Sequence, residues 1–327
     1  MQQSVVAPYT AGDGASWQGA HEVWRVVFSS RETLKRERRD PRAGRHALLA
    51  SAPRALLRSV FSVLFPSDCR LCRTPLDNIS RIPVCQDCLA NIRPLRAPQC
   101  LSCGDRLTSA QLLMGDGLCV NCRESRPEFE RAVSYGEYKD SLRGLIHLLK
   151  YEGVTPAQAP LGGMLAETIS ELLPGSKSGC GESKLLLVAV PLHRSRRRSR
   201  GFNQAELIAR AALKRLPHEL ELASAVLIRH RDTVSQVGLS REERIKNMRG
   251  AFRVGDGARV KGRHVIVVDD VMTTGTTLSE CARVLKQAGA EKVWAATVAR
   301  AFHDADLPEV AEDGAEEEVE AAASASL

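Results

Sequence analysis

Eight of the ten cysteines have a spacing that suits metal binding. They form four C-x-x-C pairs: Cys69/Cys72, Cys85/Cys88, Cys100/Cys103 and Cys119/Cys122. Two thiolates three residues apart can reach one ion when the chain between them turns tightly, and four thiolates at ~2.3 Å complete a tetrahedral zinc site. Because all-cysteine sites leave no open coordination position, the pattern predicts structural rather than catalytic zinc.

The eight ligands would hold one or two zinc ions. We favour sequential pairing, in which the first four cysteines hold one ion and the last four a second, over an interleaved arrangement. Disulfides would need an oxidising compartment, and a redox C-x-x-C would occur once rather than four times. Iron–sulfur ligation is a less favoured alternative, because no C-P signature follows the pairs. Cys180 and Cys281 stand apart and are expected to be ordinary thiols.

A second group of chemically informative residues lies at 264–277, with the sequence HVIVVDDVMTTGTT. Four apolar residues predict a buried strand that ends in Asp269 and Asp270, and the turn Thr273–Thr277 opens a helix. Backbone N–H groups and hydroxyls at a helix start bind phosphate, while a carboxylate pair accepts hydrogen bonds from sugar hydroxyls. The nucleotide-binding motif G-x-x-x-x-G-K-[ST] is absent, which argues against an NTPase. The pattern predicts a sugar-phosphate site.

Alternating strands and helices must position these residues. We expect strands at 133–138, 185–190, 265–268 and 293–299, and helices at 141–150, 161–173, 203–216 and 278–288. This alternation predicts an α/β domain with a mostly parallel sheet and helices on both faces. Ligands of such sheets bind at the carboxyl ends of the strands, which is where the acid pair falls.

Two helices have clear apolar stripes that should face the core. The inward residues are expected to be Leu142, Leu145, Ile146 and Leu149 in the first helix, and Leu278, Cys281, Ala282 and Leu285 in the last. The first stripe leaves three residues on the outward side of its helix: Arg143, His147 and Lys150.

A basic segment follows the strand at 185–190. Its candidate anion-binding residues are His193, Arg194, Arg196, Arg197, Arg198 and Arg200. Arginine forks match phosphate oxygens, so the segment suits a polyanion such as nucleic acid, with a solvated charged surface as the bland alternative. An aromatic content of only 4% argues against an extensive base-stacking platform.

Charge is unevenly distributed along the chain. The net charge is +7, but nine acids and no Lys or Arg lie beyond residue 303, so the rest of the chain carries +16. A body this basic is expected to meet polyanions. We expect four regions: a basic, disordered extension at 1–55, a cysteine-rich domain at 56–125, the α/β domain at 126–303 and an acidic, disordered tail at 304–327. No apolar run is long enough to span a membrane and no secretory signal is evident, so a cytoplasmic location is expected.

Several blocks together resemble the competence protein F (ComF) family. They are the four C-x-x-C pairs, LIHLLKY at 145–151, VPLHRSRRRSRGFNQAE at 190–206 and TVSQVGLSREERIKNMRGAF at 233–252. Residues 264–277 resemble the phosphoribosyl-pyrophosphate (PRPP) motif of type I phosphoribosyltransferases. The resemblance implies a double zinc ribbon followed by a phosphoribosyltransferase-like fold.

The resemblance also implies residue roles. Asp269 and Asp270 would hold the ribose 2′- and 3′-hydroxyls, and the 5′-phosphate would be held by Thr273, Thr274, Gly275, Thr276 and Thr277. The basic segment would bind pyrophosphate. Residues 233–252 would form a mobile loop that closes over the site and offers two further ligands, Arg244 and Asn247.

Two functions follow from the resemblance and the charge. The first is binding of PRPP or another ribose 5-phosphate ligand in the service of DNA uptake, with single-stranded DNA and the DNA-uptake helicase machinery as partners. The alternative is an active, Mg²⁺-dependent phosphoribosyltransferase of nucleotide or nucleobase metabolism. The sequence identifies no general base and no acceptor nucleophile for this transfer.

Overall fold

The computed structural model describes residues 68–76, 81–173, 185–216, 220–232 and 241–302. All of them lie within one compact unit, Arg58–Leu327. The expected extension at 1–55, the acidic tail at 304–327 and Cys180 lie outside the described residues. Within the described ranges, no helix has the length and apolar character needed to cross a membrane.

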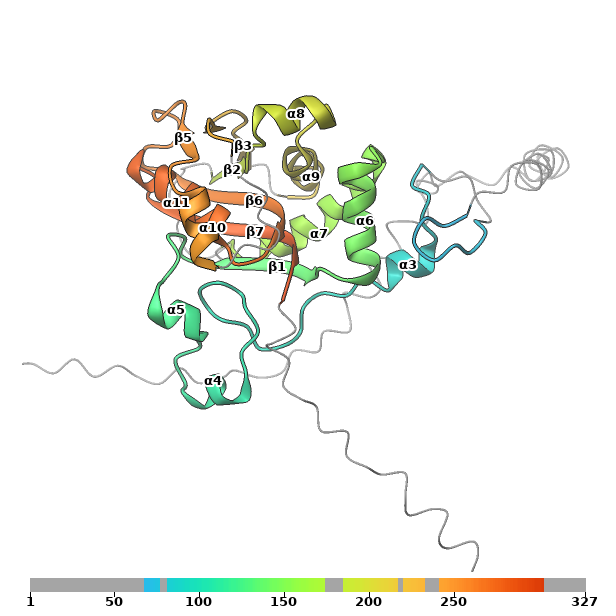
Figure 1. Ribbon diagram of the computed structural model, residues 1–327, viewed down its shortest axis with the longest axis horizontal. Helices are drawn as coiled ribbons and strands as arrows, with labels where there is room; N and C mark the ends of the chain where they lie inside the picture. Colours follow the sequence, from blue (N-terminus) through green and yellow to red (C-terminus); the bar gives the residue numbers. More distant parts are fainter. Residues whose placement is uncertain (1–67, 77–80, 174–184, 217–219, 233–240, 303–327) are drawn as a thin grey trace, which may run out of the picture. The chain divides into compact units, whose positions relative to one another are not determined.

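Five parallel strands form the central sheet, in the order β1-β7-β6-β2-β3 (Figure 1). Their bounds are β1 Ala132–Glu137, β2 Leu185–Ala189, β3 Leu220–Leu222, β6 His264–Met272 and β7 Lys292–Arg300. The expected strand at 265–268 thus continues through the acid pair to Met272. A separate two-stranded antiparallel sheet pairs β4 (Leu227–Arg229) with β5 (Phe252–Val254).

Side chains of β6 alternate between two hydrophobic cores. Ile266 and Val268 belong to the core that also holds residues of three helices, α6 (Asp140–Tyr151), α7 (Gln158–Ser170) and α9 (Gln204–Leu213). Val265 and Val267 belong to the core formed with α11 (Thr276–Gln287). Both faces of the sheet are therefore covered, which explains why the central strands are continuous apolar runs. The predicted fold class is confirmed.

Both apolar stripes predicted for the helices are buried. Every residue expected to face inward in α6 and α11 is at most 3% exposed. The basic segment that follows β2 forms a short helix, α8 (Arg194–Arg200), which ends at Gly201 with a φ of 78°. Asn203 then caps α9, because its side chain accepts from the Ala205 N–H, and its amide donates to the Val190 carbonyl at 3.0 Å. This second hydrogen bond attaches the start of α9 to Val190, the residue that follows β2.

Two cysteine modules precede the sheet. The first module, residues 68–76 and 81–92 with helix α3 (Gln86–Ala90), packs into the same core as α6. Its Leu71 lies so close to Gly144 of α6 that a Cβ on the glycine would come within 2.4 Å of the leucine. The second module, residues 99–125 with α4 (Ser109–Leu113) and α5 (Val120–Glu124), packs into the α11 core. The two modules therefore belong to opposite faces of the sheet.

Two backbone hydrogen bonds attach the segment between the modules and the start of the second module to the edge strand β1. The Leu95 N–H donates to the Tyr135 carbonyl at 2.7 Å, and the Ala132 N–H donates to the Ser102 carbonyl at 2.8 Å. Gly104 has a φ of +72°, and a Cβ there would lie 2.9 Å from the Ala132 carbonyl oxygen. Only glycine fits both this backbone conformation and this close approach.

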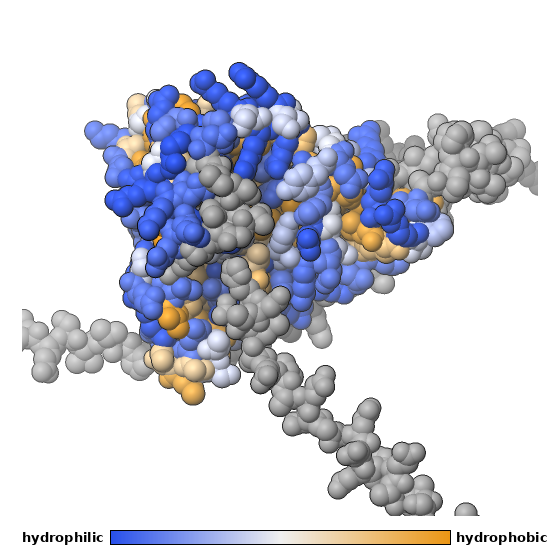
Figure 2. Space-filling view, in the orientation of Figure 1, coloured by the Kyte–Doolittle hydropathy of each residue, from blue (hydrophilic) through white to orange (hydrophobic). Residues whose placement is uncertain are grey.

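Helix α4 exposes apolar side chains. Leu113 is 90% exposed and Met114, just after the helix, is 65% exposed. Figure 2 shows this apolar group near the lower end of the surface, where Figure 1 places α4. The rest of the visible surface is mostly hydrophilic, including the region of α8 at the top.

Candidate ligand-binding site and cysteine clusters

The acid pair lies near the carboxyl end of β6, as expected. Asp269 pairs in register with Thr297 of β7, and its side chain is partly buried. Asp270 is only 3% exposed, and its N–H donates to Asp269 Oδ1 at 2.8 Å. Because neighbouring strand residues point to opposite faces, the two carboxylates start on different sides of the strand, and the hydrogen bond from the Asp270 backbone N–H holds the Asp269 carboxylate against the main chain.

Lys150 forms an ion pair with Asp270, with 2.8 Å between Nζ and Oδ2. Its side chain is 14% exposed, so the prediction that Lys150 faces solvent is wrong. The reason is helical geometry: Lys150 follows the fully buried Ile146 by four residues and so shares its face of α6. The apolar stem of the lysine extends along the core while its ammonium group reaches the end of the sheet.

Arg229 is a second cation near the acid pair, and sequence reasoning missed it. It is 8% exposed at the end of β4, and its guanidinium lies 5.6 Å from the ring centre of Phe252, its partner in the strand register. Burial lowers the pKa of Arg229, as does the charge of Arg196, whereas the charge of Asp269 opposes this decrease. No signal in the sequence marks Arg229, since its position depends on the pairing of β4 with β5.

These charges perturb the acid pair. Burial raises the pKa of Asp269, and the adjacent charge of Asp270 raises it further, while Lys150 opposes both. Burial alone would lower the pKa of Lys150, but the charges of Asp270 and Asp269 raise it above its ordinary value. The site therefore holds one carboxylate, Asp269, whose ionisation is disfavoured, and one lysine that remains charged.

The turn after β6 is shaped to leave helix N–H groups available. Gly275 caps α11 with a φ of 76° and offers no side-chain hydrogen bond to the first turn. A Cβ at this position would lie 2.6 Å from the Met272 Cε. The hydroxyls of Thr274 and Thr276 are 2.9 Å apart. The turn thus presents N–H groups and hydroxyls together at the positive end of a helix, the arrangement that binds phosphate.

A pocket of about 340 Å³ opens beside this turn. Four of the expected phosphate-binding residues line it: Thr273, Thr274, Gly275 and Thr276. Thr277, Asp269 and Asp270 are not among its lining residues. Its other walls come from the second cysteine module, α11, the end of β7 and α10 (Arg241–Met248) with the residue that follows it. The turn therefore faces this pocket, and the acid pair lies outside it.

The basic helix α8 contributes unevenly to the site. Its cap residue His193 contacts Asp232, with 3.1 Å between Nδ1 and Oδ2. Arg200 lies 5.2 Å from the ring centre of Tyr151, next to Lys150 in α6. Arg196 is exposed and acts electrostatically on Arg229. The remaining candidates are exposed and have no ion pair with a described residue: Arg194, Arg197 and Arg198.

The two candidates from 233–252 lie on α10. Arg244 is half-buried, and the Asn247 carbonyl accepts from Arg231 Nη2 at 2.8 Å. Neither residue lines the pocket, whereas their neighbours Ile245 and Arg249 do. Residues 233–240 of the expected mobile loop are outside the described residues.

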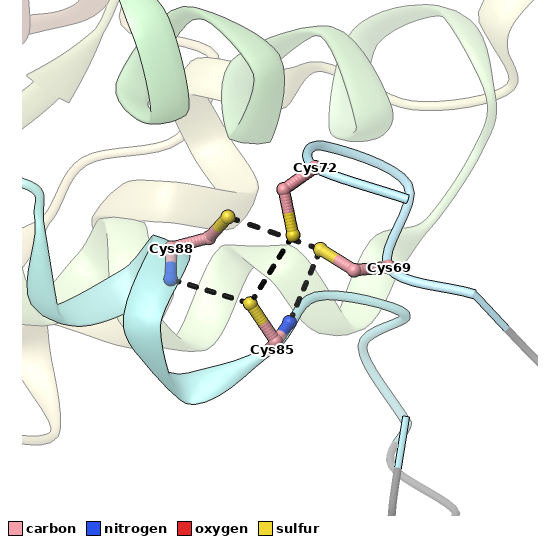
Figure 3. A group of neighbouring side chains, drawn as sticks. All are labelled: Cys69, Cys72, Cys85 and Cys88. Atoms are coloured by element: carbon pink, nitrogen blue, oxygen red, sulfur yellow. Dashed lines mark hydrogen bonds between the residues drawn. The ribbon is translucent and has the colours of Figure 1, made fainter. Parts of the chain in front are cut away.

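The eight cysteines form two separate four-residue clusters. Cys69, Cys72, Cys85 and Cys88 make the first, and Cys100, Cys103, Cys119 and Cys122 the second, with all ligand atoms of a cluster within 4.8 Å of one another. Figure 3 shows the four sulfurs of the first cluster pointing toward a common centre. The sequential grouping expected from the sequence is confirmed.

The sulfur spacings fit a tetrahedral ion. Zinc–sulfur bonds of ~2.3 Å place tetrahedral sulfurs about 3.8 Å apart. The observed Sγ–Sγ distances are 3.9 Å for Cys69–Cys88, 3.6 Å for Cys72–Cys85 and 3.6 Å for Cys103–Cys119. Backbone N–H groups also donate to Cys69 Sγ and Cys100 Sγ, both at 3.3 Å, and such bonds stabilise thiolates. The donor set of both clusters suits structural zinc.

The environments of the two clusters differ. All four cysteines of the second cluster are buried, whereas Cys72 of the first is exposed. Arg300, itself 3% exposed, donates to the Cys103 carbonyl at 2.6 Å and connects the second cluster to β7. Cys281 belongs to neither cluster. Burial raises the pKa of the Cys281 thiol well above its ordinary value, as expected of an unreactive cysteine.

Comparisons with known proteins agree with this architecture. A family model described as a double zinc ribbon domain matches residues 60–123, and one described as a phosphoribosyl transferase domain matches residues 202–321. The chain is similar to the DNA utilization protein YhgH of Salmonella typhimurium, with 34% identity over 70% of this chain and 94% of that protein. The Escherichia coli K12 protein of the same name shares 33% identity with the same coverage. Competence protein F of Haemophilus influenzae shares 29% identity over 71% of this chain and 96% of its own.

The raised pKa of Asp269 predicts that this residue destabilises the folded protein at neutral pH. Above about pH 4 the unfolded state loses this proton first, so the stability contribution falls as pH rises toward the folded pKa. Asp269→Asn keeps an oxygen for the Asp270 N–H and removes the penalty. We expect its melting temperature to exceed that of the wild type at pH 8, by roughly 2–4 °C for each 1 kcal/mol, and the difference to shrink as the pH falls toward about 4.

Asp116→Asn is the control of opposite sign for this experiment. The hydrogen bond from Arg123 lowers the pKa of Asp116 to about 2, so its substitution should lower the melting temperature at pH 8 and have less effect at acid pH. Calorimetric melting of the three proteins at both pH values measures the difference. An Asp269→Asn variant less stable than the wild type at pH 8 would contradict the assignment.

Proposed function

This chain belongs to the competence protein F (ComF) family, and on that premise we propose that it binds PRPP or another ribose 5-phosphate ligand and serves DNA uptake by handling single-stranded DNA. Its relatives are named for DNA utilization and for competence. The phosphoribosyltransferase-like fold supports the sugar-phosphate ligand, and the basic helix α8 supports the polyanion.

One observation carries the sugar-phosphate proposal: the acid pair, two buried cations and the threonine turn all gather around the carboxyl end of β6. Asp269 is the carboxylate best placed to accept hydrogen bonds from ribose hydroxyls, since Asp270 already has an ion-pair partner in Lys150. Lys150, whose pKa is raised by the carboxylates, and Arg229, whose guanidinium group is not deprotonated in proteins, would neutralise the diphosphate of PRPP. The turn 273–277 would hold the 5′-phosphate through N–H groups and hydroxyls.

Mg²⁺ would accompany a diphosphate ligand. This ion takes oxygen ligands and is usually held by one or two carboxylates together with substrate phosphates. The site offers Asp269 for this purpose, whereas Lys150 competes for Asp270. The bound ion would neutralise charge on the diphosphate. With one available carboxylate, the described residues suit an ion whose ligands come mostly from the diphosphate oxygens.

An active phosphoribosyltransferase is the alternative function. The same acid pair and turn support it, because a transferase of this kind needs carboxylates for the ribose hydroxyls and N–H groups for the 5′-phosphate. In that reaction the C1–oxygen bond to diphosphate breaks, a bond from C1 to an acceptor nucleophile forms, and diphosphate leaves. Lys150 and Arg229 would stabilise the leaving group by charge.

Titration calorimetry with PRPP and Mg²⁺ tests the ligand. Asp269→Asn is expected to weaken PRPP affinity about tenfold or more while the protein remains folded, because an amide offers one acceptor oxygen where the carboxyl group offers two. Asp87→Asn, at an exposed position of the first module, is the matched control and should leave affinity unchanged. Unaltered affinity in Asp269→Asn would refute the role of the pair. Diphosphate release by the wild type with an acceptor present would establish the enzyme alternative.

Single-stranded DNA binding is tested through its salt dependence. The exposed arginines of α8 should each add about 0.7 to the slope of log affinity against log salt. The triple variant Arg196→Ala, Arg197→Ala, Arg198→Ala is therefore expected to reduce that slope by about 2. The matched control removes three exposed arginines of the first module, Arg70, Arg73 and Arg81. Equal slopes for the two triple variants, measured by fluorescence anisotropy, would show that α8 is not the contact surface.

We further propose that each cysteine cluster holds one structural zinc ion. Metal analysis of the purified protein should then give two zinc ions per chain. Because Cys72 is exposed and the second cluster is buried, a chelator should remove zinc in two phases, with one equivalent lost first. Cys72→Ser is expected to abolish the fast phase and leave the slow one. A single phase of two equivalents in the wild type would contradict the difference in accessibility.

A further inference from the structure

The pocket beside the phosphate turn is built jointly by the α/β domain and the second cysteine module. The turn 273–276 forms one wall, with Ser279 and Arg283 of α11 beyond it. The second module supplies the opposite wall, and two of its clustered cysteines belong to it. The wall residues of the module are Cys103, Asp105, Asn121, Cys122 and Ser125. The segment after the module, Arg126–Glu128, completes that wall. No described residue of the first module lines the pocket.

The wall from the second module is fixed in place by hydrogen bonds. Arg300 Nη1 donates to the Cys103 carbonyl at 2.6 Å, and the Glu128 N–H donates to Ser279 Oγ at 3.0 Å. Phe129, which follows directly, is 3% exposed in the α11 core. Residues between these attachment points are therefore held against the phosphate turn.

Four arginines line the pocket, and two of them are already paired with carboxylates. Arg283 is committed to Glu280 by two hydrogen bonds of 2.8 and 2.7 Å, and Arg300 contacts Asp105 at 3.4 Å. Arg126 and Arg249 are exposed, and neither has an ion pair with a described residue. An anion in the pocket would therefore meet the turn on one side and the guanidinium groups of Arg126 and Arg249 on the other. A planar guanidinium group matches the spacing of two phosphate oxygens.

The size of the pocket limits what can enter it. A volume of about 340 Å³ is near the lower end of the range for small-molecule sites, which run from ~300 to ~1,000 Å³. It suits one nucleotide-sized group rather than a continuous strand. Single-stranded DNA bound here would therefore insert its terminal nucleotide. A phosphate on that terminus would lie next to the turn 273–276.

We propose that this pocket binds the 5′-phosphorylated end of single-stranded DNA, with Arg126, in the segment that directly follows the second module, as a direct phosphate contact. This inference rests on the proposed function and specifies which part of the DNA is recognised. The terminal 5′-phosphate binds the turn 273–276, and Arg126 contacts it from the opposite wall. Arg249, on the other side of the opening, meets the strand as it leaves. A free ribose 5-phosphate shares this chemistry and is the other source of such a group.

Fluorescence anisotropy with the full chain tests the inference. Two labelled single-stranded oligonucleotides of the same sequence, one with a 5′-phosphate and one with a 5′-hydroxyl, are compared. The wild type is expected to bind the phosphorylated strand about tenfold more tightly, since charged hydrogen bonds to the terminal phosphate are lost in the other strand. Arg126→Ala should remove most of this preference, and Arg126→Lys should retain part of it.

Arg81→Ala is the matched control, because it removes one exposed arginine from the first module. It should keep the tenfold preference. Equal affinity of the wild type for the two strands would overturn the inference while leaving single-strand binding, and so the proposed function, in place. A preference unaffected by Arg126→Ala would overturn the role of Arg126 as a phosphate contact.

Ribose 5-phosphate distinguishes the two sources of the ligand. It should displace the phosphorylated strand from the wild type, and Arg126→Ala should weaken its own binding in calorimetry. If ribose 5-phosphate binds in an Arg126-dependent manner while the two strands bind equally, the site belongs to the free sugar phosphate and the strand-end inference is wrong. A wild type that binds neither strand would instead refute the proposed DNA function.

Discussion

Burial of β6 on both of its faces is the constraint on which the rest of the structure depends. Its side chains fill two hydrophobic cores in alternation, so no polar group can enter the middle of the strand without leaving water. Charged residues are restricted to its carboxyl end, where the acid pair lies. The same constraint assigns each cysteine module to one face, because each module completes a different core.

The charges at the end of β6 are costly to the fold and useful to a ligand. Two adjacent carboxylates repel one another, and Lys150 compensates only one of them directly. Hydroxyl groups or a cation arriving beside Asp269 would relieve this repulsion, as expected of the proposed ligand site. Stability and ligand affinity oppose each other at Asp269, which is typical of binding sites.

The sequence predicted those features that depend on local pattern. Apolar runs identified the strands, C-x-x-C spacing identified the clusters, and the turn chemistry of Gly275 identified the start of α11. Lys150 was misplaced because helical periodicity alone treats a charged residue at the edge of an apolar stripe as solvated, although its spacing from Ile146 indicates the inner face. Arg229 and the module wall of the pocket depend on contacts between segments far apart in the chain. Such contacts follow from tertiary packing and produce no periodic pattern in the sequence.

The attachment of the modules to β1 also affects how the sheet meets other chains. β1 is an outer strand, and an outer strand with free N–H and C=O groups is a template for aggregation through added strands. Here Leu95 and Ser102 occupy hydrogen-bonding groups along that strand from the outside. These two hydrogen bonds leave fewer free backbone groups on β1 for a strand of another chain. If each module holds the proposed zinc ion, loss of that ion would loosen the segment that carries Leu95 and Ser102 and expose the hydrogen-bonding groups of β1, so metal deprivation should favour self-association through that edge.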